Sequence, residues 1–188
     1  MNKRIKKKIT KRKNKELIER YPFLKPHAYY CGYLDYEDYQ YQYTLLDEMP
    51  EGWRKRFGLL MCEMIREALI KDGLLEEYRV DQIKEKFGQL RWYDSNSNNE
   101  VHKIINQFEY ISEHTCIVCG KLDARMVNNG WMIPLCQKCN DRNHPLRPYS
   151  MWPESKLEDE FKIKQWKPSM KEPEIITISV KEIIEKIS

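Results

Sequence analysis

The sequence predicts an α+β fold, a small domain of helices and one β-hairpin with an appended four-cysteine zinc ribbon. Three observations support this prediction. Two stretches repeat apolar residues at steps of three and four, which indicates amphipathic helices. Between them, two β-prone runs flank Phe87-Gly88, a pattern typical of a hairpin. Downstream, two Cys-x-x-Cys pairs lie sixteen residues apart between positions 116 and 139, a spacing typical of a zinc ribbon.

A chain of 188 residues suits one domain plus a small module. No apolar run approaches the ~18 residues that span a bilayer, and the N-terminus lacks the apolar segment of a secretory signal. We therefore expect a cytoplasmic protein with no membrane partner. Thiols stay reduced there, so the six cysteines indicate metal binding rather than disulfides. The expected segments are a basic disordered tail (1–20), an α+β domain (21–114), a zinc ribbon (115–145) and an irregular C-terminal extension with a short strand and helix (146–188).

The net charge of +4 is unevenly distributed along the chain. Residues 1–20 hold ten Lys or Arg and two Glu, which gives +8, so the remaining residues carry −4. This basic segment has little apolar surface to bury, and we expect it to be disordered or a frayed helix. Two interpretations stay open: non-specific nucleic-acid binding by phosphate neutralisation, or a charged tail that only solvates the chain.

Tyrosines are concentrated in one acidic segment. Seven of the twelve fall between Tyr29 and Tyr43, where no Lys or Arg occurs. Tyr39, Tyr41 and Tyr43 alternate with glutamine, and this period of two predicts that their rings share one face of a strand. Either the rings cover the core from an edge strand, or they form an acidic, aromatic docking face for a protein or a stacked ligand.

An amphipathic helix is predicted after this segment. Pro50 opens it, since proline lacks only an N–H that the first helical turn leaves unpaired. Apolar residues recur from Trp53 to Leu69, and Asp72-Gly73 is a typical C-terminal stop. Cys62 lies within this stretch and is interpreted as a small buried thiol rather than a ligand.

The predicted hairpin comprises two runs, 78–86 and 89–94. It mixes basic and aromatic side chains, a combination that can stack bases and touch phosphates. An ordinary hairpin with one buried face shows the same mixture, because cross-strand aromatic pairs stabilise sheets. The candidate partner-binding residues here are Arg79, Lys84, Arg91 and Trp92.

A second amphipathic helix should follow the polar loop "SNSNNE". Ser97 or Asn98 can cap its N-terminus, and an apolar stripe runs from Val101 to Ile111. We expect the helix to end near His114 and to deliver the chain into the first cysteine pair.

The cysteine pairs predict one structural Zn²⁺. Thiolates two residues apart fit one edge of a tetrahedron, and Gly120 suits the left-handed turn of such a knuckle. Between the pairs, "ARMV" and "WMIPL" are predicted strands joined by "NNG". Four thiolates fill the coordination sphere, so the ion should be structural rather than catalytic. The predicted ligands are Cys116, Cys119, Cys136 and Cys139.

Two histidines leave alternatives open. His114 or His144 can replace a cysteine as ligand, and "PLCQKCNDRNH" faintly resembles the HNH nucleases. Those enzymes need a general-base His on a strand between the cysteine pairs, and no His occurs from Ile117 to Gln137. The sequence therefore favours a non-enzymatic protein.

The C-terminal region divides in two. Residues 145–174 hold several prolines and are expected to form an irregular strap. "IITISVKEIIEKI" then predicts a strand and a short helix, with Ser179 and Glu182 as a capping box.

A resemblance is carried by "YPFL", "YTLLDEMPEGWRKRFG", "IKEKFGQLRWYD", "YISEHTCIVCGK" and "GWMIPLCQKC", which occur in this order within residues 21–140. The combination resembles a group of zinc-ribbon proteins found in phages and mobile elements of low-GC bacteria. The resemblance implies a phage or mobile-element setting, and therefore the cytoplasm of a bacterial host cell. The group has no established activity that transfers to residues here.

Together these observations predict a non-enzymatic, zinc-stabilised binding protein. The phage setting favours a host-directed, counter-defence role, by blocking a host protein or by sequestering a small nucleotide signal. The acidic body favours such partners over duplex nucleic acid. The alternatives are a nucleic-acid-binding ribbon protein, which would use the basic tail and the hairpin, and an HNH-like nuclease.

Overall fold

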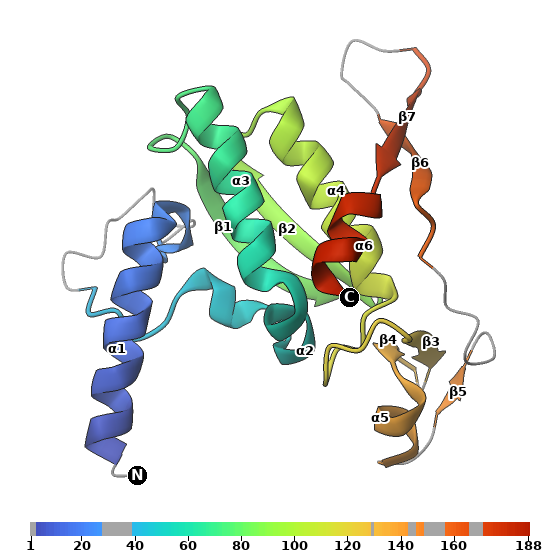
Figure 1. The fold of residues 1–188 in the computed structure, drawn as a ribbon, viewed down its shortest axis with the longest axis horizontal. Helices are drawn as coiled ribbons and strands as arrows, with labels where there is room; N and C mark the ends of the chain where they lie inside the picture. Colours follow the sequence, from blue (N-terminus) through green and yellow to red (C-terminus); the bar gives the residue numbers. More distant parts are fainter. Residues whose placement is uncertain (1–2, 28–38, 129, 143–145, 149–156, 166–170) are drawn as a thin grey trace.

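The computed structural model describes residues 3–27, 39–128, 130–142, 146–148, 157–165 and 171–188. It confirms the α+β prediction, with three antiparallel hairpins in the described part of the chain. The N-terminal helix lies at one end of the long axis and the cysteine-bearing ribbon toward the other (Figure 1).

The central body packs two helices on one hairpin. Strands β1 (Arg79–Lys86) and β2 (Gln89–Ser95) pair antiparallel, and α3 (Leu59–Lys71) and α4 (Asn99–Glu113) lie over one face of them (Figure 1). Side chains alternate between the faces of a strand, so the inward residues form the core with the two helices. They are Val80, Ile83, Leu90 and Trp92.

The helix predicted after Pro50 is confirmed and contains an irregular turn. It comprises α2 (Glu51–Trp53), the π-helical η4 (Arg54–Gly58) and α3, with Pro50 as N-cap. Cys62 is fully buried, and burial raises the pKa of its thiol. It is the buried thiol that the sequence predicts.

The tight turn at Phe87-Gly88 and the second amphipathic helix are also present as predicted from the sequence. Phe87 and Gly88 have φ values of +56° and +80°, as the two central residues of a type I′ turn require. Asn98 caps α4, because its side chain accepts a 2.8 Å hydrogen bond from the Val101 N–H. The stripe from Val101 to Ile111 is buried.

Other elements cover both edges of the β1–β2 hairpin. The Ile83 N–H donates to the carboxylate of Glu48 at 3.2 Å, in the short helix η3 (Leu45–Glu48). The Leu90 N–H donates to the Ser112 hydroxyl of α4 at 2.8 Å. Each edge therefore has a hydrogen bond to a neighbouring element, and the face of this hairpin that α3 and α4 do not cover is the open one (Figure 1).

The basic N-terminal segment is a helix rather than a disordered tail. Helix α1 spans Lys3–Arg20, because Lys and Arg are good helix formers and its C-terminal end has core contacts. Ile18 and Tyr21 are buried, and the Asn14 amide donates to the Tyr41 carbonyl at 3.0 Å. The short helix η1 (Pro22–Leu24) continues this anchor with two more buried side chains.

The predicted tyrosine strand is wrong where it can be examined. Residues 39–43 form no strand, and Tyr41 has a φ of +55°, which breaks an extended conformation. The rings contact each other instead: the Tyr39 centroid lies 5.1 Å from that of Tyr41 and 6.4 Å from that of Tyr43. The tyrosines between 28 and 38 lie outside the described residues.

The C-terminal region contributes to the core. The predicted strand and helix are present as β7 (Glu174–Ser179) and α6 (Lys181–Ile187). Residues 160–165, expected to be irregular, form β6 (Glu160–Gln165) and pair with β7, because Phe161 and Ile163 pack on the core. The predicted capping box is wrong, since Val180 is the N-cap and no side chain bonds there.

Burial shows how firmly this region is attached. Ile178, Val180, Ile183 and Ile187 belong to the main hydrophobic core, so the predicted strand and helix at the end of the chain are part of the body. None of the helices in the described part of the chain has both the length and the apolar character needed to cross a bilayer.

Candidate metal centre and its attachment to the helical domain

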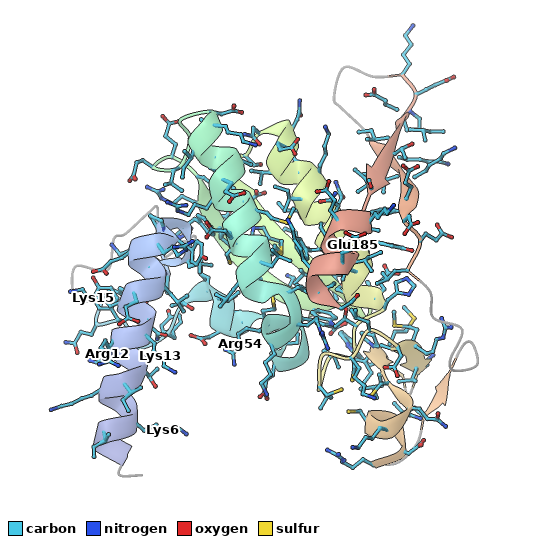
Figure 2. All side chains as sticks on the ribbon, in the orientation of Figure 1. Lys6, Arg12, Lys13, Lys15, Arg54 and Glu185 are labelled. Carbon is cyan, nitrogen blue, oxygen red and sulfur yellow. The ribbon has the colours of Figure 1, made fainter. Side chains whose placement is uncertain are left out.

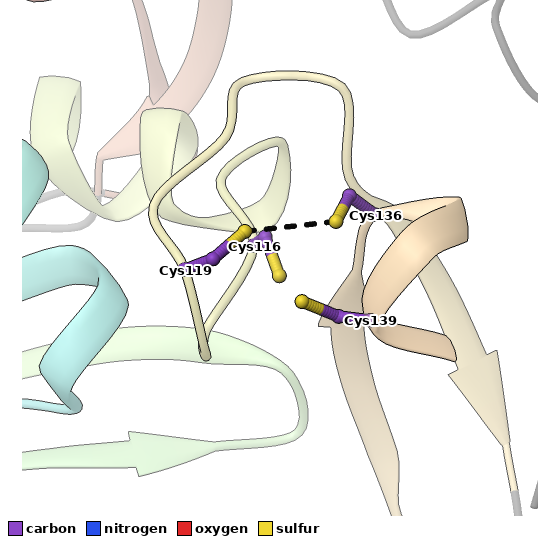
Figure 3. A group of neighbouring side chains, drawn as sticks. All are labelled: Cys116, Cys119, Cys136 and Cys139. Carbon is purple, nitrogen blue, oxygen red and sulfur yellow. Dashed lines mark hydrogen bonds between the residues drawn. The ribbon is translucent and has the colours of Figure 1, made fainter. Parts of the chain in front are cut away.

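Four cysteine side chains converge on one point. The Sγ atoms of Cys116, Cys119, Cys136 and Cys139 all lie within 4.8 Å of one another, and those of Cys119 and Cys136 are 3.6 Å apart (Figure 3). A tetrahedral Zn²⁺ with Zn–S bonds of ~2.3 Å separates its sulfurs by about 3.8 Å. The cluster therefore fits the four-thiolate site that the spacing predicts.

Local structure brings the two pairs together. Cys116 and Cys119 lie in a knuckle between α4 and β3 (Arg125–Asn128), whereas Cys136 follows β4 (Met132–Leu135) and Cys139 lies in α5 (Gln137–Arg142). The antiparallel β3–β4 pair returns the second cysteine pair to the first. A third strand, β5 (Arg147–Pro148), pairs with β3.

Backbone hydrogen bonds close the first knuckle. The Cys116 N–H donates to the Lys121 carbonyl at 2.7 Å, and the Gly120 N–H donates to the Cys116 carbonyl at 2.9 Å. Gly120 has a φ of +81°, a conformation that glycine adopts without steric cost. This confirms the role that the sequence predicts for Gly120.

The thiols differ in how readily they ionise. Burial raises the pKa of Cys136 to about 11 and also raises that of Cys139. At Cys119 burial opposes ionisation, but the Lys121 N–H and the other three thiols outweigh it and lower the pKa. A cation bound among the four sulfurs would favour the thiolate at each of them.

The histidine alternatives do not enter this cluster where they can be placed. His114 is not among the residues that could share a metal with the cysteines. Its ring lies 5.0 Å from that of Tyr110, and burial lowers its pKa. His144 lies outside the described residues.

The ribbon has a small hydrophobic core of its own. Cys116 and Cys136 pack there with three apolar side chains that are almost fully buried. These are Ala124, Val127 and Leu135. So few side chains bury too little area to hold a separate module together, and such modules depend on their metal.

The first knuckle is docked on α2 through a glycine. The Gly52 N–H donates to the Ile117 carbonyl at 2.9 Å. A Cβ atom at Gly52 would clash with the Cys116 carbonyl oxygen and lie 2.6 Å from that of Ile117. A Cβ atom at Gly120 would in turn lie 2.7 Å from the Gly52 carbonyl oxygen. Backbone therefore packs directly on backbone at this contact.

Two larger side chains extend the docking contact. The indole N–H of the fully buried Trp53 donates to the Thr115 carbonyl at 2.8 Å. Arg56 donates to the Gly120 carbonyl and to the Ile187 carbonyl of α6, each at 2.6 Å. The motif "EGWRKRFG" is thus a docking motif for the knuckle, a role that its sequence alone does not reveal because the partners lie more than sixty residues away.

The predicted partner-binding residues of the hairpin do not form one site. Trp92 is 4% exposed and its indole N–H donates to the Tyr78 hydroxyl at 2.9 Å, so the structure places this residue in the core. Arg91 pairs with Glu109 at 3.3 Å. Arg79 donates to the carbonyl oxygens of Glu76 and Tyr78, while Lys84 lies on the outward face.

The fold and the cysteine cluster thus define an α+β protein with a four-cysteine, zinc-ribbon-like metal centre. A scan against protein-family models finds no match, and searches of curated proteins and of solved structures find none either.

Proposed function

We propose that this protein is a non-catalytic, zinc-stabilised binding protein that engages the phosphate backbone of nucleic acid through α1. The observation that carries the proposal is the charge and placement of this helix. Residues 3–15 contain nine Lys or Arg and no acidic residue, and the first turns of α1 extend away from the body (Figure 1). An isolated cationic helix of this kind neutralises phosphates and releases their counterions.

The basic side chains point away from the helix axis into solvent. Figure 2 shows Lys6, Arg12, Lys13 and Lys15 projecting from α1, and all four are exposed. Eighteen helical residues span about 27 Å, and an α-helix fits the major groove of B-DNA. These properties support binding along a phosphate backbone without selection of sequence.

The attachment of α1 supports a binding role. The Lys11 ammonium donates to the Gln40 side chain at 2.8 Å, and Asn14 anchors the next turn. A shallow hollow of about 290 Å³ lies between the helix and the tyrosine segment, large enough for a phosphate group. It is lined by Lys6, Lys7, Thr10, Lys11 and Gln42.

The metal has a supporting role in this proposal. Zn²⁺ bound by four thiolates has no open position for a substrate, so it would hold the ribbon on the helical domain rather than activate water. We accordingly propose no nuclease activity.

The test is the salt dependence of binding to a labelled 20-base-pair duplex. A variant with Lys6, Lys7, Lys8, Lys11, Arg12 and Lys13 replaced by Gln should bind at least about tenfold more weakly at low salt. The slope of log K against log[salt] should fall by several units, since each neutralised phosphate contributes about 0.9.

A matched control removes six exposed lysines from the body. These are Lys71, Lys162, Lys164, Lys171, Lys181 and Lys186. This variant has the same net charge as the α1 variant, and its affinity and salt slope should stay much closer to those of the unmodified protein. Equal losses in the two variants would show that net charge, not α1, governs binding.

A host protein or a small nucleotide signal is a second proposed partner, in keeping with the phage setting that the resemblance implies. Tyr43 favours it, because this ring is 45% exposed while Tyr39 and Tyr41 pack partly on the core. Replacing Tyr43 by Ala should leave the melting temperature nearly unchanged and abolish recovery of that partner from host lysate. Unchanged recovery would exclude this surface.

A further inference from the structure

The open face of the β1–β2 hairpin carries cations, amides and an aromatic ring. Three of its outward cross-strand pairs are Gln82 with Tyr93, Lys84 with Arg91, and Lys86 with Gln89. None of these positions is acidic, although the chain outside residues 1–20 carries a net negative charge. Arg91 reaches the α4 carboxylate of Glu109, which leaves the two lysines as the available cations of this face.

Large aromatic rings are exposed where this face ends. Phe87 at the turn is 56% exposed and Trp131 of the ribbon is 53% exposed. Their ring planes differ by 26° and their centroids are 6.2 Å apart. Tyr93, on the same hairpin, is 41% exposed. Exposed rings that lie together mark an interaction site more often than scattered single ones.

Each hairpin ring has a cation beside it. The Lys86 ammonium lies 5.5 Å from the centroid of Phe87, and the Lys84 ammonium lies 4.9 Å from that of Tyr93. Alternating rings and cations suit a ligand that presents flat apolar faces at intervals along an anionic backbone.

Hydrogen bonds to Glu85 hold the Phe87–Trp131 ring pair in place. The Glu85 carboxylate accepts hydrogen bonds from the Trp131 indole N–H at 2.9 Å and from the Gly88 N–H at 2.5 Å. Gly88 packs so closely on the ribbon that a Cβ atom would lie 2.8 Å from the Cε of Met126. The hairpin turn is therefore seated on the ribbon, and the Glu85 carboxylate is engaged by hydrogen bonds from both sides of this contact.

Phe87 is an unusual residue for its position. A φ of +56° is unfavourable for a bulky side chain, and Asn-Gly is the preferred sequence of this turn. The ring is more than half exposed, so burial does not offset the strain. An outlier of this kind suggests a functional reason for the residue.

We propose that Phe87, Trp131 and Tyr93, with Lys84 and Lys86, form a base-stacking surface for single-stranded nucleic acid. Single strands offer unstacked bases to aromatic rings, whereas a duplex keeps its bases stacked inside. The surface lies on the central hairpin and the ribbon, separate from α1 at one end of the molecule (Figure 1). This proposal does not depend on phosphate binding by α1.

The experiment measures fluorescence anisotropy of labelled oligo-dT of 20 nucleotides, with the six-Gln α1 variant as background so that α1 does not mask the site. The added changes are Phe87→Asn and Trp131→Ala. Affinity should fall at least about tenfold, as expected for the loss of two stacking rings. Phe87→Asn alone should keep or raise the melting temperature, because Asn suits the turn.

Two matched variants make the result specific. Phe87→Tyr with Trp131→Phe keeps the rings and should bind within about threefold of the background protein. Leu59→Ala with Ile70→Ala removes exposed apolar surface from α3 instead and should bind unchanged. The proposal is overturned if the background protein does not bind oligo-dT, if the Asn/Ala variant binds equally well, or if the ring-preserving variant loses as much. Duplex binding by the unmodified protein tests α1 separately.

Discussion

Helix α1 and the zinc ribbon are attached to the body in opposite ways. The helix is held at its C-terminal end, where Asn14, Ile18 and Tyr21 are buried, and most of its earlier side chains are solvated. The ribbon is held along its first knuckle, by backbone contact at Gly52 and by bonds from Trp53 and Arg56.

The difference shows where stability and binding are separated in this molecule. The first half of α1 can change its charges with little effect on folding, because it adds little to the core. The knuckle contact tolerates little change, because close-packed backbone cannot relax. We therefore expect substitutions on the binding surfaces to affect folding little, and substitutions at the metal centre to affect it strongly.

The largest expected effect is loss of the metal site. Cys116→Ser removes a ligand and should reduce bound zinc to well below half an equivalent per chain, measured by elemental analysis. The ribbon should unfold, since metal binding and folding of such modules are coupled and contribute on the order of 10 kcal/mol. Chelation of the unmodified protein should have the same effect. A full equivalent of zinc in the variant would contradict the four-thiolate site.

The second-largest loss of stability is expected from adding one methyl group at the docking contact. Gly52→Ala places a Cβ atom against the Cys116 and Ile117 carbonyls and should lower the free energy of unfolding by about 3 kcal/mol or more, in the upper range of overpacking. Gly58→Ala is the control, because its Cβ would meet only side chains, no closer than 3.4 Å. Denaturant melts should show the control within about 1 kcal/mol of the unmodified protein.

Arg56→Gln should have an intermediate effect. It leaves the Gly120 and Ile187 carbonyls without their donor, and we expect a loss of about 1–3 kcal/mol. Hydrogen exchange should show faster opening of α6 and of the knuckle together, because one guanidinium joins them. Opening of only one of the two would indicate that the bridge does not couple them.

The smallest effect is expected from shortening α1. Removal of residues 1–11 takes away charge, and residues 5–11 hold no buried side chain, so the melting temperature should change by no more than about 2 °C. Extending the deletion to residue 15 removes the buried Asn14 and its bond to Tyr41, so it should cost about 1 kcal/mol more. Equal melting temperatures for the two truncations would show that Asn14 does not anchor the helix.

Local chemistry determined much of this protein. The two amphipathic helices, the Phe87-Gly88 turn, the Asn98 cap and the four cysteine ligands follow from periodicity, turn geometry and ligand spacing. Each depends on residues close together in the chain, so the sequence is sufficient to predict them. For residues 3–20 the sequence leaves disorder and a frayed helix both open, and the core contacts of Leu17 and Ile18 hold the C-terminal end of the observed helix.

The features that depend on long-range contacts were decided only by the tertiary structure. Tyr39, Tyr41 and Tyr43 alternate like a strand, yet the positive φ of Tyr41 and the packing of the segment beside α1 override that local preference. Trp92 lies inward rather than at the surface, because the helices cover that face of the hairpin. The docking role of Gly52 and the pairing of Phe87 with Trp131 join segments far apart in sequence, and no local pattern encodes such a contact.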